Sequence, residues 1–570
     1  MATAREILAE RLELALEKTY PGGGVPEVVP ATDPRFGDYQ TNVAMVLAKK
    51  LGVAPRSIAA EICRALDVRD FSDPPEVAGA GFINFRLTNE FVGRSISAIF
   101  RDARLGVSTA TERQRIIIDF SSPNVAKPMH VGHIRSTILG DCLARTARFL
   151  GHDVITDNHV GDWGTQFGKV IYGWKHFLDE PALESNAIGE LVRLYREVSA
   201  LEETDDAIRS AVREELVKLQ KGDPDNRTIW ARAVELSWRD FQKLYDLLGV
   251  RFDERLGESF YNEALAPLCD RLAAQGVAEM SEGALCIFFR DIPALADKPI
   301  IIRKSDGGFL YATTDLATIE YRAGRWNPSQ IWYVVGAPQS LHFQQIFAAA
   351  RRMDVTARLE HIAFGSILGE DRKIMRTRAG ETIGLAELLE EAIDRARAIV
   401  AERKPPLERQ DAEEIARAIG LGAVKYAELS QHRMTDYVFS WDKLLSFQGN
   451  TAPYLQNAYV RIRSIFRRLD QSFDAPELLT LKRPEERALA VSLLKFAEIV
   501  PLMLEDFRPN LLASYLYDVA IGFHIFYEAC PVLKAQGPDL RNSRLVLCDV
   551  TARVIGAGLG LLGIDCPERM

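Results

Sequence analysis

Two histidines flank a glycine in the stretch His130, Val131, Gly132 and His133, where a polar loop gives way to a helical pattern. A loop of small residues before a helix offers backbone N–H groups and the positive end of the helix dipole to an anion. Phosphate suits such a loop, and the two imidazoles could donate hydrogen bonds to its oxygens as charge builds during nucleotidyl transfer. The segment lacks GxxxxGK[ST] and GxGxxG, which excludes a P-loop and a dinucleotide fingerprint.

Two other interpretations of the histidine pair stay open at this point. An HxxH spacing can bind a metal, but no nearby cysteine or His/Glu motif completes a zinc site. The chain has seven cysteines without a CxxC pair, so we expect no protein-bound zinc and no disulfide framework. The histidines could also be purely structural.

The residues around the loop predict a βαβ unit that positions it. Ile116 to Phe120 is β-branched and apolar apart from Asp119, which predicts a buried parallel strand. Apolar residues then recur at helical spacing from residue 130 until Gly151, and a second strand is expected at 154–156. The loop SSPNVAKPM therefore lies at the carboxyl end of the sheet, where open α/β folds bind ligands.

Length and composition set the class of protein. A chain of 570 residues with 47% apolar and 26% charged residues predicts a soluble, globular protein of several domains. The N-terminus is too charged for a secretory signal and no apolar run is long enough for a bilayer, so we expect a cytoplasmic protein without membrane contacts. The net charge of −9 argues against indiscriminate nucleic-acid binding but leaves room for a local basic face.

The remaining pattern divides the chain into three parts: a separate α/β module at 1–112, the sheet domain at 113–400, and a helical bundle from 401 to 570. An insertion at about 176–299 splits the sheet domain, and its apolar stripe from Trp230 to Leu248 is expected to be core. Further strands are expected at 284–289, 299–303, 308–311 and 330–335. Helices of the bundle are expected at 411–430, 451–469, 484–507, 510–529 and 541–562.

Two basic clusters each allow a purely structural and a functional interpretation. Lys373, Arg376 and Arg378 follow a strand and a glycine, and such a cluster is usually a solvated loop. The helix from Thr451 carries arginines interleaved with tyrosines. That mixture suits unpaired bases and phosphates, although an exposed helix face would also explain it.

These motifs together carry a resemblance to one family. The histidine stretch resembles the HIGH signature of class I aminoacyl-tRNA synthetases, and SSPNVAKPMHVGHIRST is similar to the form found in arginyl-tRNA synthetases. Further segments resemble that family in its order: NHVGDWGTQFG at 158–168, FLYATTDLA at 309–317, FGSILGEDRKIMRTRAG at 364–380, SFQGNTAPYLQNAYVRIRSI at 446–465 and the closing PERM. FGDYQTN and GFINF match its amino-terminal module.

The resemblance implies an architecture and an activity. The fold would be α/β: a class I, Rossmann-like parallel-sheet catalytic domain with a helical insertion, an N-terminal α/β module and a C-terminal all-helical bundle. Arginine would attack the α-phosphate of ATP, bound with Mg²⁺ as the substrate complex, to give arginyl-adenylate and pyrophosphate. The arginyl group would then pass to the terminal ribose of tRNA(Arg), releasing AMP.

Catalysis and ATP binding would fall to two overlapping sets. The family's second signature, KMSK, is degenerate here, and Lys127 is expected to take over part of its charge. The catalytic set is Lys127, His130, Gly132, His133, Lys373, Arg376 and Arg378. The ATP-binding set is Pro123, Lys127, His130, Gly132, His133, Gly336, His342 and Met375.

Selection of arginine needs carboxylates, because a guanidinium is planar and permanently charged. Asp119 is a candidate for this role, because burying a carboxylate in an apolar strand is costly unless the carboxylate is paired. The alternative is that Asp119 only caps the end of the strand. The resemblance places six residues around arginine. Asp119, Tyr311 and Asp315 would face the guanidinium, and Asn124, His159 and Gln339 the α-amino and carboxylate groups.

The tRNA would contact both ends of the chain. Phe82 and Asn84 of the amino-terminal module are expected at the tRNA elbow. The anticodon set is Tyr454, Gln456, Tyr459, Arg461 and Met570. The family usually has an aromatic residue where this chain has Asn457, so one stacking contact is expected to be weaker or supplied elsewhere. A monomer is expected.

Two other classes were weighed against this one. A non-catalytic tRNA-binding relative would lose residues of the ATP loop, whereas both histidines, Lys127 and Asp315 are present. A class I ligase for cysteine would need a zinc site, and one for glutamate would need cations where Asp119 and Asp315 stand.

Overall fold

The computed structural model describes residues 2–369, 384–402, 408–469 and 473–570. They form two compact units, Met1–Thr109 with Glu408–Ile419 and Leu445–Met570, and Ala110–Leu407 with Gly420–Leu444. Four residues of the predicted ATP site lie outside the described residues: Lys373, Met375, Arg376 and Arg378. None of the described helices is long and apolar enough to cross a membrane.

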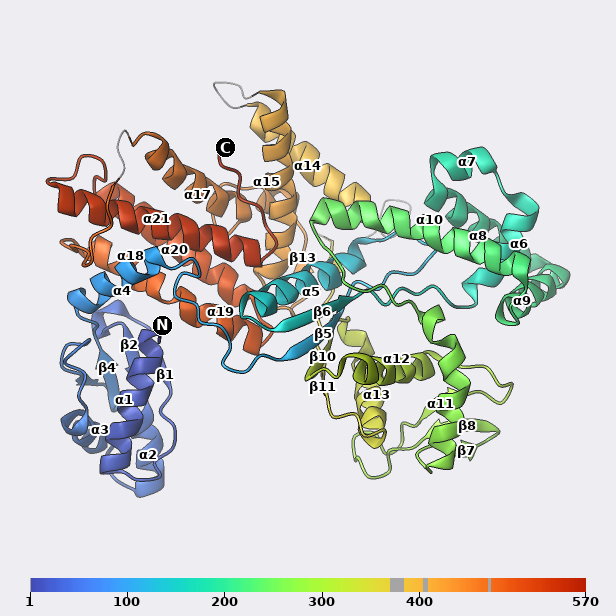
Figure 1. Ribbon diagram of the computed structural model, residues 1–570, viewed down its shortest axis with the longest axis horizontal. Coiled ribbons are helices and arrows are strands. Elements are labelled where there is room, and N and C mark those ends of the chain that lie inside the picture. Colours follow the sequence, from blue (N-terminus) through green and yellow to red (C-terminus); the bar gives the residue numbers. More distant parts are fainter. Residues whose placement is uncertain (1, 370–383, 403–407, 470–472) are drawn as a thin grey trace. The chain divides into compact units, whose positions relative to one another are not determined.

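The second unit is built on a four-stranded sheet of order β11-β10-β5-β6, in which every pairing is parallel (Figure 1). Its strands are β5 (Arg115–Asp119), β6 (Asp153–Asp157), β10 (Gln330–Tyr333) and β11 (Arg358–His361). Ile117 pairs with Ile155 on one side and Ile331 on the other. Residues 116–118 are at most 1% exposed, as expected for a strand covered on both faces. The predicted parallel-sheet α/β fold is thereby confirmed.

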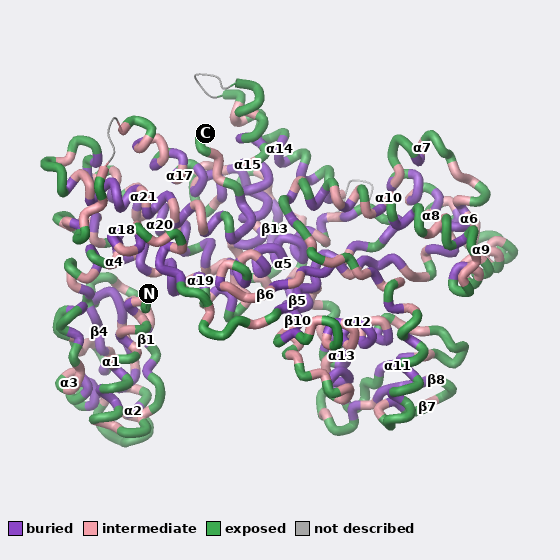
Figure 2. The backbone as a smooth tube through the Cα atoms, viewed as in Figure 1, coloured by how far each residue is buried: buried purple, intermediate pink, exposed green. Residues whose placement is uncertain are grey.

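Helix α5 (Val131–Phe149) follows the loop after β5 and packs on the sheet. Figure 2 shows α5 and the neighbouring strands buried along most of their length. The packing depends on Gly140, because a Cβ there would overlap the ring of Phe120. A side chain at that position would push the helix off the strand.

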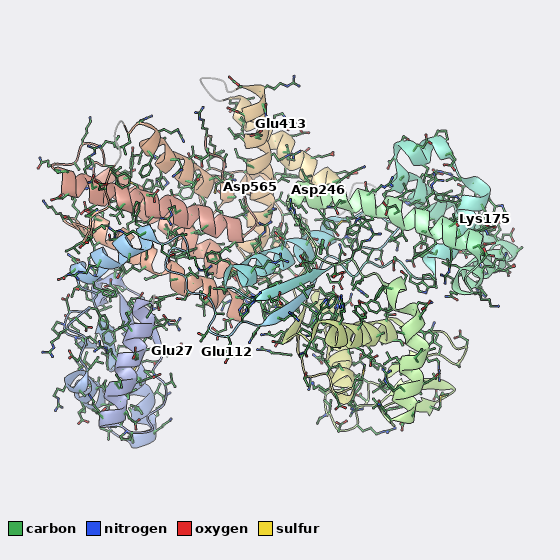
Figure 3. The ribbon with its side chains drawn as sticks, in the orientation of Figure 1. Glu27, Glu112, Lys175, Asp246, Glu413 and Asp565 are labelled. Carbon is green, nitrogen blue, oxygen red and sulfur yellow. The ribbon has the colours of Figure 1, made fainter. Side chains whose placement is uncertain are left out.

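The segment between the halves of the sheet domain is mainly helical. Its elements are α6 (Gln166–Phe177), α7 (Glu180–Ser185), α8 (Ala187–Thr204), α9 (Asp206–Gln220), α10 (Pro224–Leu248), η2 (Glu258–Tyr261), α11 (Asn262–Ala274), and the antiparallel strands β7 (Glu279–Ser281), β8 (Ala284–Ile287) and β9 (Ile300–Arg303). Lys175, labelled in Figure 3, binds Glu215 at 2.5 Å and Asn226 at 2.6 Å, which joins α6, α9 and α10.

The rest of this unit returns to the sheet. Its elements are α12 (Tyr311–Trp326), η3 (Ala337–Gln339), α13 (Ser340–Arg352), β12 (Ile367–Leu368), α14 (Leu385–Ala401), β13 (Tyr437–Val438) and α16 (Trp441–Leu444). The strand predicted at 308–311 is wrong. Phe309 makes only an isolated bridge to Arg303, and Leu310, although extended, is the N-cap of α12, so the apolar run starts a helix.

The first unit contains an antiparallel sheet of order β1-β2-β4-β3. The amino-terminal elements are α1 (Ala4–Thr19), β1 (Val28–Pro30), η1 (Pro34–Phe36), β2 (Tyr39–Thr41), α2 (Val43–Leu51), α3 (Pro55–Ala65), β3 (Glu76–Ala78), β4 (Phe82–Phe85) and α4 (Asn89–Arg101). Asp38, in the FGDYQTN stretch, accepts from Leu87 N at 2.8 Å and pairs with Arg487 at 2.6 Å. The stretch therefore packs on the helical part of the same unit.

The late helices follow the predicted pattern with one exception. They are α15 (Arg409–Leu429), which runs from one unit into the other, α17 (Ala452–Arg467), α18 (Pro484–Leu494), α19 (Phe496–Glu505), α20 (Pro509–Ala529) and α21 (Pro538–Leu561). The single helix predicted at 484–507 is wrong, because α18 and α19 are separated at Lys495. Neither glycine nor proline marks that break.

Candidate active site

A cavity of about 530 Å³ opens where β5 and β10 end. It gathers side chains from loops that are far apart in sequence, as the carboxyl edge of a parallel sheet does. Eleven of the sequence-predicted residues line it: Asp119, Asn124, His130, Gly132, His133, His159, Tyr311, Asp315, Gly336, Gln339 and His342. All six residues expected to bind arginine and five of the eight expected to bind ATP thus line one cavity, whereas Pro123 and Lys127 do not line it.

The loop after β5 is strained and held from outside. Ser121, Ser122 and Ala126 have φ of 72°, 46° and 60°, a region that costs non-glycine residues about 1–3 kcal/mol each. Ser121 Oγ lies 2.8 Å from the Tyr245 hydroxyl, and Ala126 N donates to Ser237 Oγ at 3.1 Å. Helix α10, expected only as core, therefore fixes the shape of the loop.

His130 and His133 cap α5 reciprocally. Gly132 N donates to His130 Nδ1 at 3.1 Å, and His130 N donates to His133 Nδ1 at 3.1 Å. Because each Nδ1 accepts, the hydrogen of each neutral ring is on Nε2. Gly132 allows this closure, since a Cβ there would come within 2.9 Å of His130 Nδ1. The motif thus holds the two rings as donors, which is the role predicted for phosphate oxygens.

Both histidines are held neutral. Burial lowers the pKa of His133 to about 4, with His130 adding to the effect. Burial, followed by the ammonium of Lys127, lowers the pKa of His130. Near neutral pH the pair offers hydrogen-bond donors rather than charge.

Lys127 stands between the histidines and the helical segment. Its Nζ lies 5.7 Å from the ring centroid of Tyr195 in α8, and Lys169 Nζ lies 5.2 Å from the same ring. Lys169 is paired with Glu202 at 2.8 Å, whereas the described residues offer Lys127 no carboxylate within 4.0 Å. Its charge therefore remains available to an anion. Pro123, the other loop residue expected to bind ATP, accepts from Gly161 N at 3.0 Å.

Asp119 is paired inside the protein. Arg322 Nη2, on α12, donates to Asp119 Oδ2 and to Asp157 Oδ2, each at 2.7 Å, and Arg322 is fully buried. Ser122 Oγ donates to Asp119 Oδ1 at 3.1 Å. The apolar strand explains why Asp119 needs a partner, whereas the fold determines that the partner is Arg322. Asp119 still lines the cavity.

Asn124 and His159 both line the cavity, and each is held by a neighbouring segment. Gly161 forms a bridge with Asn124, and a Cβ on Gly161 would overlap Asn124 Oδ1. His159 Nδ1 lies 2.9 Å from the carbonyl oxygen of Leu256. A carbonyl only accepts, so Nδ1 carries the hydrogen and, in the neutral ring, Nε2 is an acceptor. An ammonium group is the complement of these two residues.

Asp315 is oriented by His342, whose Nε2 donates to Asp315 Oδ2 at 2.6 Å. His342 was expected among the ATP-binding residues. Here it also orients the carboxylate of Asp315, which was expected to bind the substrate arginine. Tyr311, 69% exposed, and Gln339 lie at the rim of the cavity. One further lining carboxylate, Glu258, was not predicted, because no motif marks it in the sequence.

The residues expected to contact tRNA lie in the first unit, and two of them are buried. Gln456 is 0% exposed, and its Nε2 donates to the carbonyl oxygens of Ala418 at 2.9 Å and Asp565 at 2.8 Å. Its role as a direct contact is therefore corrected to a structural one, because its amide is already committed within the unit. Asn84 is 4% exposed, and Phe82 beside it on β4 is half-buried.

The other candidates on α17 belong to an aromatic surface shared with α20. The ring of Tyr454 lies 5.5 Å from that of Tyr517 and 5.4 Å from that of His524. Arg461 lies 4.8 Å from the ring of Tyr527. Clustered aromatic rings beside a guanidinium suit unpaired bases. Tyr459 instead donates to Glu568 at 3.0 Å, close to the terminal Met570.

Models of three protein families match the chain in succession. The model described as the arginyl tRNA synthetase N terminal domain matches residues 6–87. That of the class I tRNA synthetases (R), catalytic domain, matches residues 95–441. The DALR anticodon binding domain matches residues 455–570.

Individual proteins are similar over the full length. The arginine–tRNA ligase of Cellvibrio japonicus is 46% identical, with 99% of this chain and 100% of that protein covered. That of Synechococcus elongatus is 44% identical, with both chains covered completely. Among solved structures, arginyl-tRNA synthetase from Plasmodium falciparum has a TM-score of 0.87 at 30% identity, and that from Thermus thermophilus 0.85 at 27%, each covering 100% of both chains.

Proposed function

Because the chain belongs to the arginyl-tRNA synthetases of class I, we propose that the cavity at the end of β5 and β10 binds arginine and ATP side by side. The chain is an arginine–tRNA ligase: it joins L-arginine to tRNA(Arg) at the expense of ATP, through an adenylate. One observation carries the site assignment. Two neutral imidazole donors and several carboxylates line the same cavity of about 530 Å³.

The arginine end is assigned to the acidic side of the cavity. Asp119, Tyr311 and Asp315 would face the guanidinium, and Asn124, His159 and Gln339 would hold the α-amino and carboxylate groups. The arrangement supports this division, since His159 Nε2 can accept from an ammonium and Asp315 is already oriented by His342. A carboxylate that accepts a forked pair of hydrogen bonds selects arginine over lysine.

The phosphate end is assigned to Lys127, His130, Gly132 and His133, with Pro123, Gly336 and His342 completing the ATP site. Mg²⁺ would arrive with ATP as part of the substrate. The imidazole Nε2–H groups would donate to oxygens of the α-phosphate as arginine attacks, and the Lys127 ammonium would balance the growing charge. Lys373, Met375, Arg376 and Arg378 would complete the site from the second signature.

The division of labour along the chain is proposed from the same motifs. Residues 1–112 would contact the tRNA elbow, 113–400 would carry the chemistry around an insertion at about 176–299, and 401–570 would read the anticodon loop. For the last task the surface of Tyr454, His524 and Arg461 is the strongest support. A cytoplasmic monomer without bound zinc remains the expected form.

ATP–pyrophosphate exchange with each amino acid, run with and without tRNA, tests this assignment. Exchange that depends on arginine supports it. Exchange that depends on glutamate or cysteine, or none under either condition, would contradict it. The exchange assay without tRNA is uninformative by itself, because members of the family can require tRNA during activation.

A further inference from the structure

Arg135, two residues after His133 on α5, forms a buried ion pair inside the second unit. Its Nε lies 3.0 Å from Glu428 Oε2 on α15, and the two side chains are 4% and 3% exposed. Its Nη1 donates to the carbonyl oxygen of Thr435 at 3.1 Å. The chemistry proposed for the cavity does not use this pair, and a buried ion pair often stabilises a chain no better than apolar packing does. Stability alone therefore does not explain it.

Tyr437, on β13, joins the same ion pair. Its hydroxyl group hydrogen-bonds to the Glu428 carboxylate, and its ring centroid lies 5.7 Å from the central carbon of the Arg135 guanidinium. Burial raises the pKa of Glu428 to about 7, while the charge of Arg135 and the hydroxyl group of Tyr437 oppose the rise. Above neutral pH the carboxylate is therefore mainly charged. We call Arg135, Glu428 and Tyr437 the α5 anchor.

The segment that carries Tyr437 also binds a second segment, residues 363–368. Tyr437 pairs with Ile367 in the parallel ladder of β12 and β13. Gly365 N donates to the carbonyl oxygen of Arg433 at 2.9 Å. A Cβ on Gly365 would come within 2.8 Å of Asp436 Oδ1, so the two segments pack without room for a side chain there.

Residues 363–368 form one wall of the cavity. Phe364 and Gly336 both line the cavity, and their backbones form a bridge with each other. His130 and His133 line the same cavity at the start of α5. The segment 433–439 thus binds both the helix of the two histidines, through the α5 anchor, and the wall that contains Phe364.

We propose that the α5 anchor sets the separation between the histidine motif and the Phe364 wall, and thereby positions the imidazole donors against the α-phosphate of ATP. This inference rests on the proposed assignment of the histidines to ATP. None of the three anchor residues lines the cavity, so they act through the histidines as positioning residues. Charged, hydrogen-bonded groups tolerate fewer geometries than apolar groups, so the anchor favours a single position of α5.

The first test is the kinetics of ATP–pyrophosphate exchange by Glu428→Gln at pH 8 in the presence of tRNA(Arg). The value of kcat should fall about tenfold to a hundredfold, because displaced donors no longer meet the phosphate in one geometry. The KM for arginine should stay within about twofold, since the arginine end is held by other contacts, such as that of Asp315 with His342. A variant that is merely less well folded would not separate kcat from this KM.

The matched control is Glu486→Gln in the first unit. Glu486 forms an equally buried ion pair with Arg544, 2.7 Å apart, and neither residue lines the cavity. The control should leave kcat within about twofold of the natural chain. A kcat in Glu428→Gln as high as that in Glu486→Gln overturns the proposal.

The second test asks whether the anchor acts through the histidines. The ring donor is absent in His130→Asn, so adding Glu428→Gln to that variant should lower kcat by about threefold or less. A loss as large as the one that Glu428→Gln causes in the natural chain overturns the proposal, because a purely structural role would act equally in both backgrounds.

Tyr437→Phe replaces Glu428→Gln if the latter does not fold, as judged by thermal unfolding. It removes one hydroxyl group, and kcat should fall about threefold to tenfold without a change in the arginine KM. Its control is Tyr515→Phe, because the buried Tyr515 hydroxyl group donates to the carbonyl oxygen of Ser492 at 3.0 Å in the first unit. Equal kcat values in the two variants overturn the proposal. A natural chain without arginine-dependent exchange would instead contradict the proposed function.

Discussion

Arg322 Nη2 lies 2.7 Å from Asp119 Oδ2, so a guanidinium from the protein itself is bound at the edge of the cavity assigned to a guanidinium substrate. Asp157 lies at the same distance from the same nitrogen. The buried Arg322 guanidinium thus partly neutralises the charges of two buried carboxylates. The other acidic side chains of the cavity are Asp315 and Glu258.

Asp119→Asn should raise the KM for arginine more than the KM for ATP. The amide keeps the shape of the side chain but removes the charge that Arg322 and the cavity share. Stability should fall by about 1–3 kcal/mol, because Arg322 is left with one carboxylate. Exchange kinetics and urea unfolding measure the two effects, and equal changes in both KM values would count against an arginine role.

Arg322→Met should destabilise the chain by about 3–5 kcal/mol, since two buried carboxylates lose their common partner. Urea unfolding of the variant and the natural chain measures the loss. A loss below about 1 kcal/mol would contradict the argument that the buried carboxylates need this partner.

His130→Asn separates capping from catalysis. Asparagine is a good N-cap and can accept from Gly132 N, so stability should stay within about 1 kcal/mol of the natural chain. It lacks the ring Nε2–H, so kcat should fall roughly a hundredfold or more. His130→Ala removes both the N-cap acceptor and the Nε2–H donor, so both stability and kcat should fall. A full kcat in His130→Asn would mean that the ring acts only as a cap.

His133 should make the chain less stable in mild acid. Its pKa falls from 6.5 in the unfolded chain to about 4 in the folded one, so only the unfolded chain takes up the proton between these values. Stability should therefore fall as pH drops from 6.5 towards 4, by about 1–3 kcal/mol. His133→Gln, whose side chain does not titrate, should not show this part of the loss of stability in acid. Guanidinium unfolding of both chains across this range is the measurement.

Gly140→Ala should destabilise the chain by about 1–3 kcal/mol, because its methyl group meets the ring of Phe120 between α5 and β5. The matched control is Gly324→Ala in α12, where a Cβ meets no atom within 4 Å. That change should be neutral or stabilise by up to about 1 kcal/mol. Thermal unfolding of the two variants measures both effects on stability. Equal effects would contradict the packing argument.

Sequence periodicity was sufficient for the unit of β5, α5 and β6, because each of these elements carries its own signal. The β-branched run of β5, the glycine that ends α5 and the histidine motif are all local. The break at Lys495 was missed because neither glycine nor proline marks it. The start of α12 at Tyr311 was missed because the apolar run before it resembles a strand.

The site was predictable only where residues are adjacent to a motif. Arg322, Tyr245 and Glu258 reach it from α12, α10 and η2, and their choice of partner is made by the fold. Gln456 shows the opposite error: its place in a basic, aromatic helix suggested a surface role, whereas its side chain faces inward.

On the proposed role of Lys127, its contact with Tyr195 would make the rate of the chemistry depend on α8, a helix none of whose residues lines the cavity. A displacement of Tyr195 would then change the position of the Lys127 ammonium relative to His130. Substitutions that only repack the helical segment would be expected to alter kcat and to leave the substrate affinities unchanged.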